Sequence, residues 1–291
     1  MRTPEHVTAA EVGQFYDAMW QDGFSPGALA HGAAYIGQEC LLSAAEILAL
    51  GQIAEISRAT FVLDLGSGTG GPACYLAQHL GCRVLGLDVS AVGQARASRR
   101  AQEQGLQHLV EFRHGDVQHL ELPAASVDVI LGLDAWCHIP QRAAMLQRCA
   151  TWLRAGGRLA FYDHVERHPL PADERLPFYA QCCFPDLETP RSYIAALTAA
   201  GLQVDFETET AFNATRVYTP LLAAHTTQRD SPEASRGPAR YQAELTRLQR
   251  MQRFAAYGML GQIGCVALKP AGDTNPRRTG RPHGEYSGDH A

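Results

Sequence analysis

The first group of residues that could carry chemistry is a glycine-rich stretch, LDLGSGTGG, at residues 63–71. Glycines after an apolar segment allow a tight turn and a close approach of the backbone to a ligand. Gly66, Gly68 and Gly71 fit the G-x-G-x-x-G spacing of a dinucleotide site, although small residues also serve only to pack a helix against a strand. Asp88 ends the next apolar segment, VLGLDVS, where a carboxylate can accept hydrogen bonds from a ribose. These features together predict a site for a cofactor that contains a nucleoside.

Asp64 bears on the choice between two cofactors of this kind. With Gly66, Gly68 and Gly70 it fits the spacing D-x-G-x-G-x-G of an S-adenosylmethionine (SAM) site. A carboxylate beside the loop would repel the pyrophosphate of a dinucleotide, whereas SAM carries an ammonium and a sulfonium. Aspartate is also a common helix-capping and turn residue, so Asp64 alone does not decide the cofactor.

Three later segments extend the pattern. FRHGD places Asp116 after a third apolar segment, VDVILGLDAWCHIP runs from a fourth into a short loop, and LRAGGRLAFYD has a Gly-Gly turn before a fifth. In order and spacing the chain resembles the class I SAM-dependent methyltransferases, closely over residues 60–165 and in outline over 190–268. YDAMW, LDLGSGTGGPACYLA and DAWCHIP resemble the small-molecule members, such as the sarcosine/dimethylglycine N-methyltransferases and related C-methyltransferases.

The resemblance implies that the cofactor is SAM. Asp88 would bind its ribose, Val89 would pack on its adenine, and Asp116 with Val117 would bound the adenine edge. The full set of cofactor-binding residues implied in this way is Asp64, Gly66, Ser67, Gly68, Gly70, Asp88, Val89, Asp116, Val117, Leu133 and Asp134.

Methyl transfer from a sulfonium needs an aligned acceptor and a dry site more than any one catalytic residue type. His138 is the candidate for a base or for a group that positions the acceptor, because its ordinary pKa is near neutrality. It could instead contact the SAM carboxylate or only shape the loop. Trp136 is either a cation–π wall or a hydrophobic anchor. The candidates for the substrate pocket are Tyr16, Tyr35, Trp136 and Tyr162.

Residues 163–168, DHVERH, carry side chains of the types that bind metals, spaced two apart. Alternate polar residues are also ordinary at the end of a strand. We therefore expect no metal site.

The elements that must position these residues are alternating strands and helices. FVLDLG, CRVLGLDV, LVEFRHGD, VDVILGLD and GRLAFYDHV are apolar enough for buried parallel strands, with the helical segments 71–81, 91–105 and 140–157 between them. Before them we expect helices over 8–20 and 38–53, and after them a helix over 189–201 and strands at 202–209 and 261–270. This alternation predicts an α/β fold with a Rossmann-like sheet. The family adds seven strands, mostly parallel with an antiparallel last strand, helices on both faces and a helical lid.

The expected organisation has five parts. They are an N-terminal helical lid segment (1–58), a SAM-binding core (59–210), a helical lid insert (211–257), the last core strand (258–269) and a disordered, Gly/Pro-rich tail (270–291).

The composition and net charge indicate which classes of partner the protein has. The net charge is −5, with 46% hydrophobic and 19% charged residues, so nothing indicates a nucleic-acid or membrane surface. The eight cysteines include no C-x-x-C pair, and the first residues lack the apolar core of a signal peptide. We expect a cytoplasmic protein; the oligomeric state stays open.

The leading hypothesis is an enzyme that moves the SAM methyl group to a small molecule, first an amine nitrogen, and releases S-adenosylhomocysteine (SAH). Carbon or oxygen methylation in secondary metabolism is the closest alternative. A SAM-binding protein that does not methylate and a nicotinamide oxidoreductase are the other classes, and Asp64 argues against the last.

Overall fold

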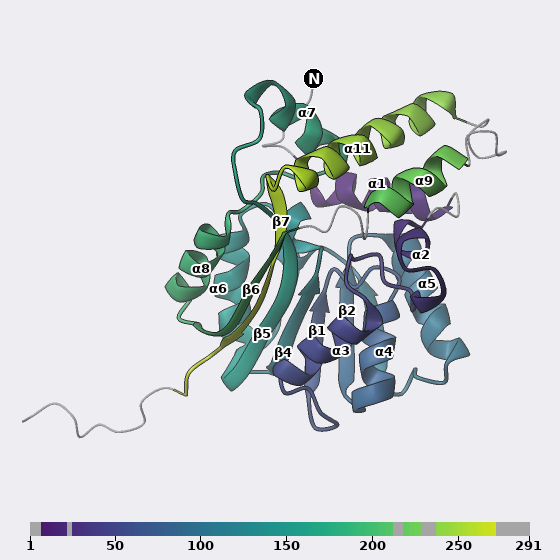
Figure 1. Ribbon diagram of the computed structural model, residues 1–291. Coiled ribbons are helices and arrows are strands. Elements are labelled where there is room, and N and C mark those ends of the chain that lie inside the picture. The colour runs from purple at the N-terminus through teal and green to yellow at the C-terminus, as the bar shows by residue number, and fades with distance from the viewer. Residues whose placement is uncertain (1–6, 22–24, 212–217, 228–236, 272–291) are drawn as a thin grey trace, which may run out of the picture.

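The computed structural model describes residues 7–21, 25–211, 218–227 and 237–271. Its centre is a seven-stranded sheet in the order β3-β2-β1-β4-β5-β7-β6 (Figure 1). The strands are β1 (Phe61–Leu65), β2 (Arg83–Asp88), β3 (Val110–His114), β4 (Val127–Leu133), β5 (Leu153–Glu166), β6 (Gln203–Ala211) and β7 (Leu260–Leu268). Strand β7 is antiparallel to both β5 and β6, and the pairs among β1 to β5 are parallel. The predicted sheet, with its antiparallel last strand, is confirmed.

Helices cover both faces of this sheet and the edge where the parallel strands end (Figure 1). Helices α3 (Ala44–Ile53), α4 (Gly71–Leu80) and α5 (Ala91–Glu103) lie on one face, and α6 (Arg142–Trp152) and α8 (Pro190–Ala199) on the other. The remaining helices lie toward the carboxyl ends of the strands: α1 (Ala9–Gln21), α2 (Pro26–His31), α7 (Ala172–Cys182), α9 (Tyr218–Thr227) and α11 (Pro238–Ala256). Short 3₁₀ helices complete the path: η2 (Gly32–Ala34), η3 (Val117–His119) and η4 (Trp136–His138).

The core forms because the central strands are apolar on both sides. In β1, Leu63 and Leu65 belong to the cluster under α6 and α8, while Val62 belongs to the cluster under α3 and α4. A third apolar cluster, which includes Phe178, Phe184 and Phe254, joins α7 to α9 and α11. The chain order reverses between β1 and β4, the place where open α/β sheets leave a crevice for ligands.

Two predicted helices have different bounds in the structure, and two helices were not predicted. The helix expected over 38–53 begins only at Ala44, because Ser43 adopts an extended conformation and caps it. The segment expected to be helical to 157 becomes strand at Leu153, which pairs with Val127. Neither α2 nor α7 was predicted; α7 contains Pro177, a residue that usually interrupts a helix.

The start of α3 gives a first testable prediction. The Ser43 hydroxyl accepts from the Glu46 amide, and the Glu46 carboxylate accepts from the Ser43 amide at 2.7 Å. We expect Ser43→Ala to lower the free energy of unfolding by about 1 kcal/mol, since it removes half of a capping box. Denaturant titration measures this. Ser43→Asp, which keeps a capping oxygen, should lose less, and equal losses in both variants would contradict the assignment.

The structure also bears on the cysteines, on membrane spans and on part of the expected organisation. All eight cysteines are free thiols, seven of them buried. Among the described residues, no helix combines the length and apolar character needed to cross a membrane. Residues 212–217 and 228–236 of the predicted lid insert and residues 272–291 of the predicted tail lie outside the described residues.

Candidate active site

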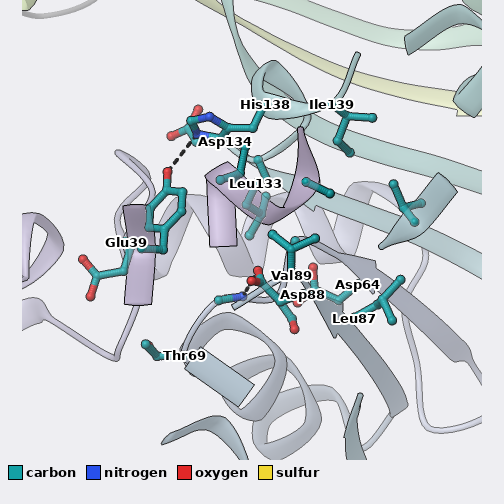
Figure 2. Close-up of a pocket in the computed structure, with 18 of the residues that line it drawn as sticks. Glu39, Asp64, Thr69, Leu87, Asp88, Val89, Leu133, Asp134, His138 and Ile139 are labelled. Atoms are coloured by element: carbon teal, nitrogen blue, oxygen red, sulfur yellow. Dashed lines mark hydrogen bonds between the residues drawn. The ribbon is translucent and has the colours of Figure 1, made fainter. Parts of the chain in front are cut away.

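A cavity lies at the carboxyl ends of β1, β2 and β4, and α1 covers it. In Figure 2, Asp64, Asp88 and Val89 lie toward one end of it and His138 toward the other, with Leu133 between them. Eleven of the predicted cofactor or catalytic residues line it: Asp64, Gly66, Ser67, Gly68, Asp88, Val89, Asp116, Val117, Leu133, Asp134 and His138. The fold thus brings together residues that are spread over 75 positions of the chain, from 64 to 138.

The glycine loop has the backbone that its sequence requires. Gly66, Gly68 and Gly70 have φ angles of 87°, 53° and 76°, a region that favours glycine. A Cβ atom on Gly66 would lie 2.3 Å from that of Ala135, and one on Gly70 would lie 2.7 Å from that of Ala97. Gly66 and Gly68 line the cavity, whereas Gly70 is the N-cap of α4. Gly70 packs against Ala97, and its contact with the cofactor stays a prediction.

Asp64 lies in β1, paired with Gly86, and its side chain borders the cavity. It is 2% exposed, and no described residue donates a hydrogen bond to its carboxylate. Burial, with a smaller contribution from the Asp88 charge, raises the pKa of Asp64 to about 7. A cation that entered the cavity would favour the ionised carboxylate.

This pKa predicts a pH dependence of cofactor binding. SAM is expected to bind about tenfold more tightly at about pH 7.5 than at about pH 5.5, because a cationic ligand displaces the proton that Asp64 holds below its pKa. The folded protein holds this proton up to about pH 7, whereas the unfolded chain loses it near pH 4. The contribution of Asp64 to the free energy of unfolding therefore falls as the pH rises from about 4 toward 7. Calorimetric titration at both pH values measures the affinity. Asp64→Asn should flatten the dependence, and an unchanged slope in that variant would exclude Asp64 as its source.

Asp88 joins the end of β2 to the glycine loop. Its Oδ2 accepts from the Gly68 amide at 2.9 Å, and its Oδ1 accepts from the Ser90 amide at 2.8 Å. Burial raises the pKa of Asp88, while these two hydrogen bonds oppose the rise. Each carboxylate oxygen keeps a lone pair for a ligand hydroxyl.

The segment after β3 forms another wall of the cavity. Asp116 caps η3 by accepting from the Gln118 amide at 2.9 Å, and it lies 3.3 Å from the His119 ring nitrogen Nδ1. Val117, which is buried, and Gln118 line the cavity beside it. This wall combines an apolar side chain with a carboxylate, a pairing that suits a purine ring and its amino group.

At the other end, His138 is hydrogen-bonded through both ring nitrogens. Its Nδ1 lies 3.1 Å from the Cys183 carbonyl oxygen, which can only accept, so Nδ1 carries the proton. Nε2 therefore accepts from the Tyr16 hydroxyl at 2.8 Å, the bond that reaches His138 in Figure 2. Burial lowers the pKa of His138 to about 4 and raises the pKa of Tyr16 well above its ordinary value, so both are neutral near pH 7. The Tyr16 oxygen keeps two lone pairs beside the cavity.

Beneath this end lies a buried polar network. Asp134, with φ at +52°, accepts from the Leu41 amide at 2.8 Å and lies 3.1 Å from His164 Nδ1. Asp163 accepts from the Cys137 amide at 3.0 Å. Cys137, Asp163 and His164 have residue types that bind metals and lie within 4.8 Å of one another. Because hydrogen bonds to protein groups already engage Asp163 and His164, we assign this cluster to support of the loop above it.

Three of the four predicted pocket residues do not line the cavity. Trp136 is fully buried, stacks on Phe161 with ring centroids 4.9 Å apart, and donates to the Leu65 carbonyl at 3.1 Å. It is a hydrophobic anchor, and the cation–π alternative is wrong. Tyr162 packs over Gly264 of β7. Tyr35 donates to Glu39 at 2.8 Å and so supports the wall from behind. Of these four residues, Tyr16 alone lines the cavity.

Glu39 and Trp20 are among the lining residues that were not predicted. Glu39, inside a segment expected to be helical, accepts hydrogen bonds from the Gly27 amide and the Ser25 and Tyr35 hydroxyls. Trp20 of α1 is buried, and its indole N–H has no acceptor among the described residues. A polar residue before a helix cap and a tryptophan at the end of an amphipathic stripe were the available signals.

The charge of the cavity restricts its ligands. Five carboxylates line it, from Glu39, Asp64, Asp88, Asp116 and Asp134, and its described lining includes no lysine or arginine. A pyrophosphate would be repelled there, whereas an ammonium and a sulfonium would be attracted. The buried Asp64 carboxylate and the glycine backbone therefore fit SAM better than a dinucleotide.

Comparison with known proteins agrees with this chemistry. Residues 63–161 match the family described as a methyltransferase domain. The chain is similar to the glycine/sarcosine/dimethylglycine N-methyltransferase of Actinopolyspora halophila, with 32% identity over 154 residues that make up 53% of this chain and 27% of that protein. It is 30% identical to the sarcosine/dimethylglycine N-methyltransferase of Halorhodospira halochloris over 52% of this chain and 54% of that protein. The matches thus span less than two thirds of either relative.

The fold has solved counterparts. The structure of a putative sarcosine dimethylglycine methyltransferase from Galdieria sulphuraria aligns with a TM-score of 0.70 at 20% identity, over 78% of this chain and 85% of that one. The family match falls on β1 to β5, the part of the sheet that builds the cavity. The chain therefore contains a methyltransferase domain, built on the fold of the class I methyltransferases.

Proposed function

We propose that this protein is a SAM-dependent methyltransferase that transfers a methyl group to a small molecule, first of all to an amine nitrogen, and releases SAH. The observation that carries the proposal is the glycine loop beside two carboxylates, the buried Asp64 and the partly buried Asp88, in a cavity lined by acidic side chains. Bound SAM would supply the sulfonium-activated methyl group.

The chain's own residues would hold the cofactor as follows. Asp88 would accept from the ribose hydroxyls, and Val89, Asp116 and Val117 would bound the adenine. Asp64 would face the ammonium of the methionine part. The Trp20 indole N–H, buried and without an acceptor among the described residues, is a donor suited to the methionine carboxylate.

Tyr16 and His138 would orient the acceptor. Because the Tyr16 proton is directed to His138, the Tyr16 oxygen can accept a hydrogen bond from an N–H or O–H of the acceptor. That bond would turn the acceptor's lone pair toward the methyl group, and α1 would exclude water. With a pKa of about 4, His138 acts here as a hydrogen-bond acceptor for Tyr16 rather than as a store for the acceptor's proton.

An amine is the first choice for two reasons. The acidic lining attracts an ammonium, which must lose its proton to solvent before its nitrogen can attack the methyl group. The relatives described above are named as N-methyltransferases of glycine, sarcosine and dimethylglycine, or of the last two. Other relatives are named as a sterol 24-C-methyltransferase and a 27-O-demethylrifamycin SV methyltransferase, so carbon and oxygen acceptors belong in the test.

The test is SAH release, measured by mass spectrometry, with SAM and a panel of amines, amino acids, phenols and sterol-like or prenyl acceptors. Turnover with an amine that is lost in Asp88→Ala supports the proposal as stated. Turnover with another class keeps the methyltransferase and replaces the acceptor. SAM binding without turnover across the panel favours a SAM-binding protein that does not methylate, and binding of NADH but not SAH overturns the cofactor.

A further inference from the structure

Arg142, the first residue of α6, reaches back to the loop that carries His138. It is 3% exposed, and its Nη1 lies 3.3, 3.5 and 3.0 Å from the carbonyl oxygens of Trp136, Cys137 and Ile139. These carbonyls surround His138 in η4 and just after it. One guanidinium group thus donates hydrogen bonds to three backbone carbonyls of this turn.

The same guanidinium also holds a second segment. Its Nη2 is paired with Asp186, and its Nε lies 3.7 Å from Glu188. This segment follows Cys183, whose carbonyl oxygen accepts from His138 Nδ1. Arg142 therefore links the two pieces of chain between which the imidazole is held.

Arg148 lies six residues further along α6 and makes a similar set of contacts at the other end of the cavity. Its Nη1 donates to the carbonyl oxygens of Val117 at 3.0 Å and Gln118 at 2.6 Å, and its Nη2 to that of Leu120. Its guanidinium carbon lies 5.0 Å from the Trp152 ring centroid. Val117 and Gln118 line the cavity beside Asp116.

We propose that these two arginines of α6 are positioning residues with separate tasks: Arg142 fixes the orientation and tautomer of His138, and Arg148 fixes the adenine-side wall. The proposal rests on the proposed function for what each end of the cavity does. Neither arginine lines the cavity, so each acts through the backbone carbonyls to which it donates hydrogen bonds. A planar, five-donor guanidinium suits this task, because it can bond several carbonyls at once and stays charged.

The test compares Arg142→Met with Arg148→Met, which each keep an unbranched apolar side chain and remove the donors. In Arg142→Met, kcat is expected to fall about 30-fold while the dissociation constant of SAH stays within about twofold, because only the His138 end is loosened. In Arg148→Met, the dissociation constant of SAH is expected to rise about tenfold with a smaller change in kcat. Arg154→Met, at a 59% exposed side chain outside the cavity, is the matched control.

A second readout does not depend on turnover. Nitrogen NMR of labelled histidine reports the tautomer of His138, with its signal among the twelve histidines assigned by His138→Asn. A single Nδ1–H tautomer is expected in the wild type and in Arg148→Met, and a mixture of tautomers in Arg142→Met. If either methionine variant unfolds, Arg142→Lys and Arg148→Lys replace the pair, with smaller effects in the same directions.

The experiments distinguish a failure of the proposed function from a failure of the tasks assigned to Arg142 and Arg148. Absence of turnover in the wild type contradicts the proposed function, but SAH affinity and the His138 tautomer still test the arginines. An unchanged tautomer in Arg142→Met, or equal effects of both substitutions on SAH binding, would overturn the division of tasks.

Discussion

Replacing Tyr16 with phenylalanine is expected to lower kcat about 100-fold, a loss typical of removing a positioned proton-transfer or hydrogen-bonding group, with the SAM dissociation constant unchanged. The hydroxyl is the only part removed, and its 2.8 Å bond to His138 aims its lone pairs at the cavity. Steady-state kinetics with the acceptor found by the panel measures the split between kcat and KM.

His138→Ala should give a similar loss, and the double variant should lose little more than either single one. Residues that act as one unit are strongly non-additive, because either substitution already breaks the pair. Since the pKa of His138 is about 4, the wild-type profile should show no limb near pH 6.5 from this residue.

Tyr257→Phe is the control, because Tyr257 is 71% exposed and lies outside the cavity. Multiplicative losses in the double variant would mean that Tyr16 and His138 act separately. A wild-type kcat in Tyr16→Phe would remove Tyr16 from the mechanism.

Asp88→Ala is expected to weaken SAM binding about 100-fold, the second large effect, because one carboxylate serves both the loop and the ligand. Its removal leaves the Gly68 and Ser90 amides without their acceptor and takes away the contact proposed for the ribose. Calorimetry with SAM and SAH measures the affinities, and both should fall together since both contain the ribose.

Asp88→Asn separates the two tasks of Asp88. The amide keeps one oxygen acceptor, so its loss of affinity should be smaller than that of the alanine variant. Asp173→Ala, at an exposed position on α7, controls for the loss of a negative charge. Undiminished binding in Asp88→Ala would contradict the placement of the ribose.

The central sheet and one end of the site could be predicted from sequence because their signals are local. The apolar run before Gly66 and the acidic residue that ends the next run, Asp88, each follow from the geometry of a strand that enters a turn. Gly66 has a φ of 87°, a conformation that favours glycine, so the residue type itself marks the turn.

The remainder depends on contacts that no short pattern encodes. Tyr16 and His138 are 122 positions apart and meet only once α1 lies over the strands. Trp136 follows Asp134 and precedes His138, yet the 3₁₀ turn directs its indole back to Leu65. Glu39 was placed in a helix because the apolar pattern of 38–53 continues through it, whereas the capping box at Ser43 decides where the helix begins.

The place of β7 in the sheet has a consequence for how the protein is made. Strand β7 lies between β5 and β6, and β6 pairs in the sheet with β7 alone. On the ribosome, β5 and β6 therefore emerge with no partner between them until residues 260–268 arrive. A nascent chain paused before that point exposes two open strand edges, which are templates for aggregation. The part of the sheet that matches the methyltransferase family, residues 63–161, thus keeps an unpaired edge at β5 until a strand about a hundred residues later is translated.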